Sequence, residues 1–232
     1  MFIKKIVLKN FRNFSEVDYS FKNNLNFILG RNGSGKTSIL EAVHYLAFTK
    51  SFRASNDREV ICNDADYFQI FGEIEKTDQT DKVNLNFVKN EGKRVLINDK
   101  VLEKKREIIG QYPVISLSPD DEKITKGPPS ERRNFVDKIL SQTNKEYFQS
   151  LLNYNRQLRQ RNSLLKQYKE QNKFQYDTLL ESVDELLIQD ALVIVQNRKK
   201  FFDEFNIYFK KEIEKVGHFD YDCQLKLKLN TP

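Results

Sequence analysis

The fold is decided by one stretch of the sequence, Gly30-Arg31-Asn32-Gly33-Ser34-Gly35-Lys36-Thr37. It fits the pattern G-x-x-x-x-G-K-[ST] of loops that surround phosphate groups. Glycines let successive backbone N–H groups turn inward on an anion, and a helix that begins at the loop adds the positive end of its dipole. A lysine in this pattern reaches the β- and γ-phosphates, and the hydroxyl that follows it binds Mg²⁺. The stretch therefore predicts a site for a nucleoside triphosphate.

The segments on both sides of the loop have the character that the motif requires. Residues 25–29 form a short apolar run that predicts a strand, and residues 38–47 place apolar side chains on one face of a predicted helix. Strand, glycine-rich loop and helix is the context in which this motif binds phosphate. A chance match in a Gly/Ser turn before a helix is the less favoured alternative. The predicted nucleotide-binding residues here are Gly30, Arg31, Asn32, Gly33, Ser34, Gly35, Lys36, Thr37 and Ser38, and Thr37 is also the predicted metal ligand.

The composition is that of a globular protein with a modest basic excess. Of 232 residues, 39% are hydrophobic and 31% are charged, which suits one large domain or two small ones. The formal net charge of +6 permits an anionic partner such as DNA but does not require one. Two cysteines that lie far apart suggest neither a zinc site nor a disulfide framework. The sequence has no long apolar run and no signal-peptide pattern, so we expect no membrane partner and a cytoplasmic location.

The first half of the chain predicts a sheet with an antiparallel edge. Strands are expected at residues 2–9, 17–21, 67–74, 83–88, 94–97 and 114–117, in addition to the strand before the loop. The turn signals between the middle strands favour an antiparallel meander at the edge of the nucleotide domain.

The second half predicts a helical arm. One element is predicted to end, and a helix to begin, at Gly127-Pro128-Pro129-Ser130. Ser130 is placed to cap a helix that begins at Glu131. Apolar residues at helical spacing predict two long helices, 144–169 and 179–216, which would pack as an antiparallel hairpin. Alternation over residues 221–229 predicts a strand. We therefore expect an α/β head at residues 1–126, an arm at 127–217 and the start of a return strand at 218–232.

The order of these elements distinguishes among proteins that share the loop. The sequence contains neither the D-x-x-G nor the Asn-Lys-x-Asp motif of GTPases. A loop behind two strands, then an antiparallel edge and an inserted helical arm, resembles the ABC-type ATPase heads of the Rad50, structural-maintenance-of-chromosomes and RecF group. The expected fold class is thus a P-loop ABC-type ATPase head with a mixed sheet and an inserted arm.

Within that group the chain most resembles the RecF family of bacterial DNA replication and repair proteins, over essentially all of its length. Two matching segments look specific to RecF, the run from Gly127 to Asp137 and Gln160-Arg161-Asn162. The remaining matches are Leu8-Lys9-Asn10-Phe11-Arg12-Asn13, the loop with Glu41-Ala42, Lys50-Ser51-Phe52-Arg53 and Ser118-Pro119-Asp120-Asp121.

One departure from the family pattern concerns catalysis. The RecF family carries an ABC signature segment and a Walker B strand that ends in two acidic residues, and neither is found in this sequence. The chain therefore resembles the first two-thirds of a RecF protein. We expect nucleotide binding with weak or absent hydrolysis, although full-length members are expected to be slow, DNA-stimulated ATPases.

The resemblance implies cofactors and partners. It implies ATP and Mg²⁺, single-stranded or gapped DNA, the proteins RecO and RecR, an ATP-dependent homodimer, and a role in DNA recombination, DNA damage and the SOS response. Two alternatives stay open at this point. The chain could be an inactive nucleotide-binding fragment that serves as a regulatory module, or the head of a short Rad50-like complex.

Several further residues are candidates for the site, and each also has a simpler explanation. Arg12 and Asn13 would contact a phosphate or the ribose, or form an ordinary surface turn. Arg53 resembles a position that couples nucleotide to DNA. Arg132 and Arg133 oppose a helix dipole, so DNA contact or a plain salt bridge would explain them. Asp120 and Asp121 would lie near Mg²⁺ or cap a short helix, and the basic clusters Lys104-Lys105-Arg106, Arg156-Arg159-Arg161 and Lys199-Lys200 would bind DNA or form solvated faces.

Overall fold

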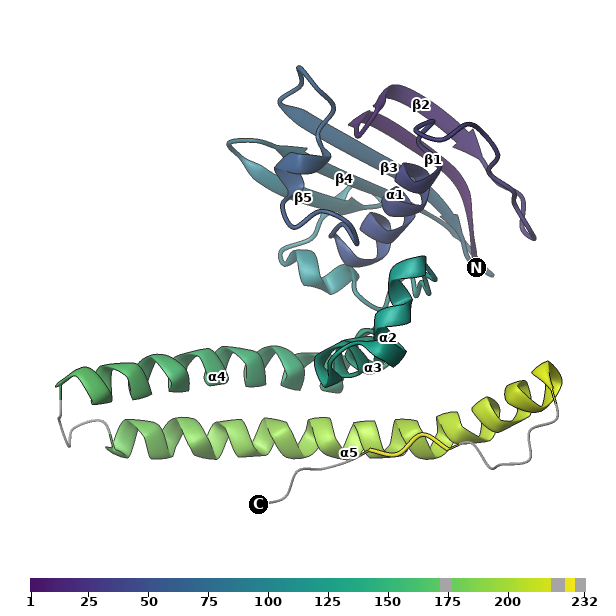
Figure 1. Ribbon diagram of the computed structural model, residues 1–232. Coiled ribbons are helices and arrows are strands. Elements are labelled where there is room, and N and C mark those ends of the chain that lie inside the picture. The colour runs from purple at the N-terminus through teal and green to yellow at the C-terminus, as the bar shows by residue number, and fades with distance from the viewer. Residues whose placement is uncertain (172–176, 218–223, 228–232) are drawn as a thin grey trace. The chain divides into compact units, whose positions relative to one another are not determined.

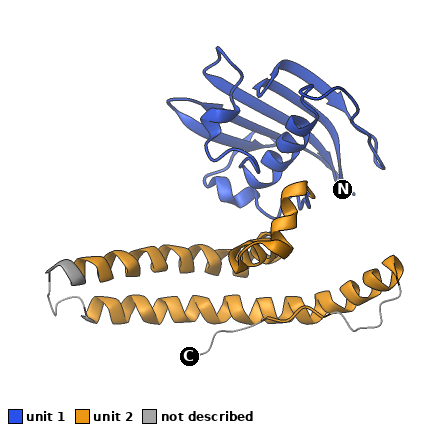
Figure 2. Cartoon of the chain, in the orientation of Figure 1, with its two compact units in different colours: residues 1–116 blue, residues 117–232 orange. Residues whose placement is uncertain are grey.

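The chain forms two compact units, residues 1–116 and 117–232, in a computed structural model that describes residues 1–171, 177–217 and 224–227 (Figure 1 and Figure 2). Each unit has a hydrophobic core of its own, so each is described separately. The division of the chain at residues 126 and 127 stays a prediction about domains.

The first unit is built on an antiparallel sheet of six strands in the order β2-β1-β3-β4-β5-β6. Alternate residues of its central strands are buried, because one face of the sheet carries the core. The predicted antiparallel meander is confirmed. The strands are β1 (Phe2–Phe11), β2 (Phe14–Ser20), β3 (Tyr67–Glu75), β4 (Thr80–Val88), β5 (Gly92–Ile97) and β6 (Lys100–Val101).

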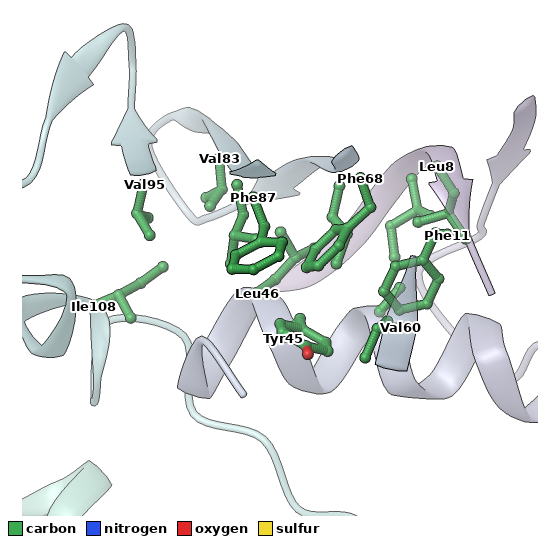
Figure 3. Packing of buried hydrophobic residues seen from close by; sticks show 14 of the residues in the cluster. Leu8, Phe11, Tyr45, Leu46, Val60, Phe68, Val83, Phe87, Val95 and Ile108 are labelled. Carbon is green, nitrogen blue, oxygen red and sulfur yellow. The ribbon is translucent and has the colours of Figure 1, made fainter. Parts of the chain in front are cut away.

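Helix α1 (Lys36–Phe48) lies against one face of this sheet (Figure 1). Tyr45 and Leu46 point from the helix toward the rings of Phe68 and Phe87 (Figure 3). The ring centroids of Tyr45 and Phe68 are 5.6 Å apart, and that of Phe11 lies 5.5 Å from Phe68, both edge to face. This packing fixes the helix that follows the loop, and with it the place where the loop ends.

Two predicted strands are wrong. Residues 25–29 and 114–117 belong to none of the six strands of the described sheet. Most of their apolar side chains are open to solvent, with Leu29 88% and Ile115 85% exposed, whereas Ile28 and Val114 are half-buried. An apolar run becomes a strand only when a neighbouring strand accepts its backbone hydrogen bonds, and periodicity does not report that neighbour.

The second unit is helical, as predicted. Helices α2 (Glu122–Lys126) and α3 (Pro129–Thr143) precede the long helices α4 (Lys145–Gln171) and α5 (Asp177–Val216), which run side by side (Figure 1). The prediction that Ser130 caps a helix is wrong. Helix α3 starts two residues earlier than predicted, with Pro129 at its first position, where the missing N–H of proline costs nothing.

A polar cluster ties three of these helices together. The guanidinium of Arg198 donates to Asp137 at 2.6 Å and to the hydroxyl of Tyr147 at 3.1 Å, and Tyr147 also donates to Asp137. Burial raises the pKa of Tyr147, and the carboxylate of Asp137 raises it further. The cluster therefore keeps the phenol neutral and sets α3 and α5 against the first turn of α4.

The predicted strand at residues 221–229 lies partly outside the described residues. Residues 224–227 are described and form no strand. Instead, the side-chain amide of Asn206 in α5 donates to the carbonyl of Leu225 and accepts from its N–H, both at 2.8 Å. None of the described helices is both long and apolar enough to cross a bilayer.

Candidate nucleotide-binding site

The loop before α1 leads into a helix start that has no side-chain cap. Gly33 and Gly35 have φ of 81° and 91°, in the left-handed region that glycine tolerates. Gly35 is the N-cap of α1 and has no side chain to cap the helix, and the first turn contains no acidic residue. The N–H groups at this helix start therefore stay available to an anion.

A cavity of about 280 Å³ lies at this helix start. It brings together residues from three separate segments, namely the turn after β1, the loop with the start of α1, and the segment after α1. The residues that line it are Asn13, Asn32, Gly33, Gly35, Lys36, Thr37, Ser38 and Arg53. Of the other residues predicted to bind nucleotide, Gly30, Arg31 and Ser34 belong to the loop without lining the cavity, and Arg12 does not line it either.

Lys36 is held by the loop itself. Its ammonium donates to the carbonyl oxygens of Gly30 at 2.7 Å and Arg31 at 2.8 Å. These bonds keep the ammonium beside the first two residues of the loop. A phosphate oxygen is a stronger acceptor than a backbone carbonyl, because both partners are then charged.

Asn13 connects the first hairpin to the loop. The hairpin turns over Arg12 and Asn13, since Phe11 of β1 pairs with Phe14 of β2. The amide of Asn13 donates to the carbonyl of Gly33 at 3.2 Å. Its oxygen accepts from the hydroxyl of Ser38 at 3.5 Å. Asn13 therefore reaches the cavity from the strand side, and its contact with a phosphate or the ribose stays a prediction.

Arg12 faces a carboxylate rather than the cavity. Its Nε and Nη2 atoms donate to the two oxygens of Glu41 at 2.9 Å and 2.6 Å, and its Nη1 donates to the carbonyl of Glu59 at 3.0 Å. The hydrogen bond to Glu41 raises the pKa of Arg12 further above its ordinary value. The sequence named Glu41 only within a segment that matches RecF and gave it no role. The available signal was a carboxylate between apolar residues on the core face of a predicted helix.

The residues proposed for DNA contact are in different surroundings. Arg53 lines the cavity, and its guanidinium lies 3.9 Å from Glu41. Arg132, in the first turns of α3, donates to the carbonyl of Gly127 at 3.2 Å and that of Ile124 at 3.4 Å, and Arg133 is exposed beside it. Arg161 in α4 pairs with Asp184 in α5 at 2.5 Å. This ion pair between the two helices accounts for an arginine at position 161 without a DNA contact.

Of the two carboxylates after residue 117, Asp121 caps a helix and Asp120 forms an ion pair. Asp121 accepts from the backbone N–H and the hydroxyl of Ser118, which forms a capping box at the 3-10 helix η3 (Pro119–Asp121). Asp120 pairs with Lys123 at 3.2 Å. Within the described residues, no group of three or more His, Cys, Asp or Glu side chains could hold a metal ion.

Comparison with known proteins agrees with this geometry. The family model described as an AAA domain matches residues 5–228. The chain belongs to the AAA domain family. The matched residues include the loop, α1 and most of the sheet.

Within the AAA domain family, the chain is similar to proteins named DNA replication and repair protein RecF. The one from Salinibacter ruber is 40% identical over 88% of this chain and 50% of the relative. The one from Bacillus cytotoxicus is 38% identical over 87% of this chain and 53% of the relative. The predicted resemblance to RecF is confirmed, and this chain spans about half the length of those relatives.

Solved structures give the same result for the fold. The structure of the recombination mediator protein RecF-ATPrS in the RecFOR pathway has a TM-score of 0.87 and 33% identity, over 93% of this chain and 58% of that one. An Smc head domain from Pyrococcus furiosus shares the fold at a TM-score of 0.50 and 20% identity, over 92% and 62% of the two chains. The predicted ABC-type ATPase head fold is confirmed.

Proposed function

We propose that this chain binds ATP with Mg²⁺ at residues 30–37, as part of a RecF-type DNA replication and repair protein. The observation that carries the proposal is the cavity at the uncapped start of α1, lined by Lys36 and Thr37. Backbone N–H groups and a lysine ammonium are the donors that a triphosphate requires. Loop and cavity lie in a chain whose named relatives are RecF proteins.

The residues of the cavity fit a triphosphate with its metal ion. Lys36 would exchange its two backbone carbonyls for phosphate oxygens, because both are within the reach of its flexible side chain. Thr37 would supply a hydroxyl to Mg²⁺, an ion that otherwise takes phosphate oxygens and water. When bound, Mg²⁺ supplies charge neutralisation across the β- and γ-phosphates.

A second candidate function is nucleotide binding without turnover, as in a regulatory module. The eight described residues that line the cavity include no aspartate or glutamate. In the RecF family, hydrolysis is expected to need the Walker B carboxylates, which hold the metal and orient the water. We therefore propose that this chain alone binds ATP and hydrolyses it slowly or not at all.

Measurements of ATP binding and of ATP hydrolysis distinguish these two candidate functions. Calorimetric titration of this chain with MgATP is expected to show one site, and a phosphate-release assay is expected to show no steady-state turnover above buffer. Turnover that Lys36→Ala abolishes would contradict the proposal of binding without hydrolysis. An absence of binding by the wild-type chain would contradict the nucleotide site itself.

We further propose that the protein binds single-stranded or gapped DNA and dimerises with ATP, in the cytoplasm and with RecO and RecR as partners in the SOS response. The support is the likeness to proteins named for DNA replication and repair. The candidate contacts on the first unit are Lys104, Lys105 and Arg106, at the start of the 3-10 helix η2 (Lys105–Ile108). Lysine and arginine contacts of this kind meet phosphates and give little sequence specificity.

Salt dependence tests whether phosphates are the contacts. Fluorescence anisotropy with a gapped duplex and MgATP is expected to show affinity falling at least about tenfold between 50 and 200 mM salt, because counterions are released on binding. A duplex without the gap, at the same two salt concentrations, is the control. An affinity that stays flat with salt would exclude backbone contact as the basis of binding.

A further inference from the structure

Glu41 is a charged residue in the core of the first unit. Its side chain is 0% exposed although it lies in the second turn of α1, two residues after Ile39 and next to Ala42. A carboxylate is rarely buried to this extent unless cations or hydrogen bonds compensate it. The groups that compensate Glu41 come from the two segments that flank the phosphate cavity.

The first compensating group is Arg12. Its guanidinium binds both oxygens of Glu41, a geometry that is strong and directional. Arg12 itself is fixed at the hairpin turn, where its backbone N–H donates to the carbonyl of Val60 at 2.7 Å. This pair satisfies the charge of Glu41 without any contribution from the cavity side.

The second group is the turn that follows α1. The hydroxyl of Ser51 donates to Glu41 and in turn accepts from the N–H groups of Arg53 at 2.8 Å and Ala54 at 2.7 Å. Glu41 therefore holds the hydroxyl that shapes the turn. That turn sets the position from which Arg53 enters the cavity.

The third group is the guanidinium of Arg53, which is held loosely. It lies 3.9 Å from Glu41, against 2.6 Å for Arg12, and its side chain is 47% exposed. Arg53 lines the cavity and Arg12 does not. Because Arg12 already neutralises Glu41, Arg53 can leave the carboxylate without stranding a buried charge.

We propose that Glu41 is a positioning residue of the phosphate site, which holds Arg53 ready beside the cavity and releases its guanidinium to a bound nucleotide phosphate. The proposal rests on the proposed nucleotide binding. Glu41 touches no ligand and acts through the turn at Ser51 and through Arg53. A phosphate carries more negative charge than the carboxylate, and Glu41 keeps its pair with Arg12, so the guanidinium of Arg53 is expected to move to the phosphate.

A double-mutant cycle tests this coupling. Calorimetric titration with MgATP is performed on the wild type, Glu41→Gln, Arg53→Ala and the double variant, with thermal unfolding of each. Each single variant is expected to weaken MgATP about tenfold, the loss of one charge-assisted contact. The double variant is expected to be weaker than the wild type by about tenfold, not about a hundredfold, because both changes remove the same contact.

Three results would overturn the inference. They are wild-type affinity in a folded Glu41→Gln variant, losses that multiply in the double variant, and wild-type affinity in Ser51→Ala, which removes the hydroxyl but leaves the Arg12–Glu41 pair. If Glu41→Gln fails to fold, Ser51→Ala alone decides, with a loss of several-fold expected. A wild-type chain that binds no MgATP overturns the proposed function and this inference together, whereas binding with unaffected Glu41 and Ser51 variants overturns the inference only.

Discussion

Lys36→Ala is expected to weaken the binding of MgATP by about a hundredfold, because it removes charge-assisted bonds to two phosphate groups. The ammonium is one of two cationic groups among the residues that line the cavity, the other being Arg53. Lys36 is also the first residue of α1, so its side chain extends from the helix start itself. Calorimetric titration with MgATP measures the loss.

The same substitution should leave the fold intact. The partners of Lys36 are carbonyl oxygens in an exposed part of the loop, and water can replace the ammonium there. Thermal unfolding of the variant is therefore expected to match the wild type within about 0.5 kcal/mol. Lys9→Ala is a matched control, since Lys9 pairs with Glu16 on the surface of the same unit at 3.0 Å. If both variants bound MgATP like the wild type, the nucleotide would have to bind elsewhere.

The sequence predicted those parts of the molecule whose signal is local. The loop motif, the helix after it, the central strands and the two arm helices all follow from spacing within a short window, and all are present. Residues 25–29 show where local reasoning ends. The run has the pattern of a buried strand, yet Leu25, Phe27 and Leu29 are exposed, because strand formation depends on a partner strand.

The candidate site shows the same limit. The loop residues are contiguous and were all anticipated, and the resemblance to RecF supplied Asn13 and Arg53. The role of Arg12 depended on Glu41, which is 29 residues away in the sequence. No periodicity within either segment indicates that pair. Only the seating of α1 on the sheet, with Tyr45 and Leu46 in the core, brings the two side chains together.

Gly35→Ala is expected to destabilise the first unit by about 3 kcal/mol and to abolish MgATP binding. Gly35 has φ of 91°, which strains any residue with a side chain, and a Cβ there would lie 2.3 Å from the ring of Phe14 and 2.9 Å from the amide of Asn13. Both neighbours belong to the first hairpin, so the loop and the hairpin would have to separate. Urea unfolding and titration with MgATP measure the two effects.

Gly92→Ala separates backbone strain from the clash. Gly92 has φ of 86° but nothing within 4 Å of its Cβ position, and it lies in β5 away from the loop. The Gly92→Ala substitution is expected to lower the free energy of unfolding by about 1 kcal/mol and to leave the affinity for MgATP unchanged. If Gly35→Ala cost no more than Gly92→Ala, Phe14 would be able to move aside freely. The hairpin would then not hold the loop in its phosphate-binding shape. The close approach of Gly35 to Phe14 and Asn13 would have no effect on nucleotide binding.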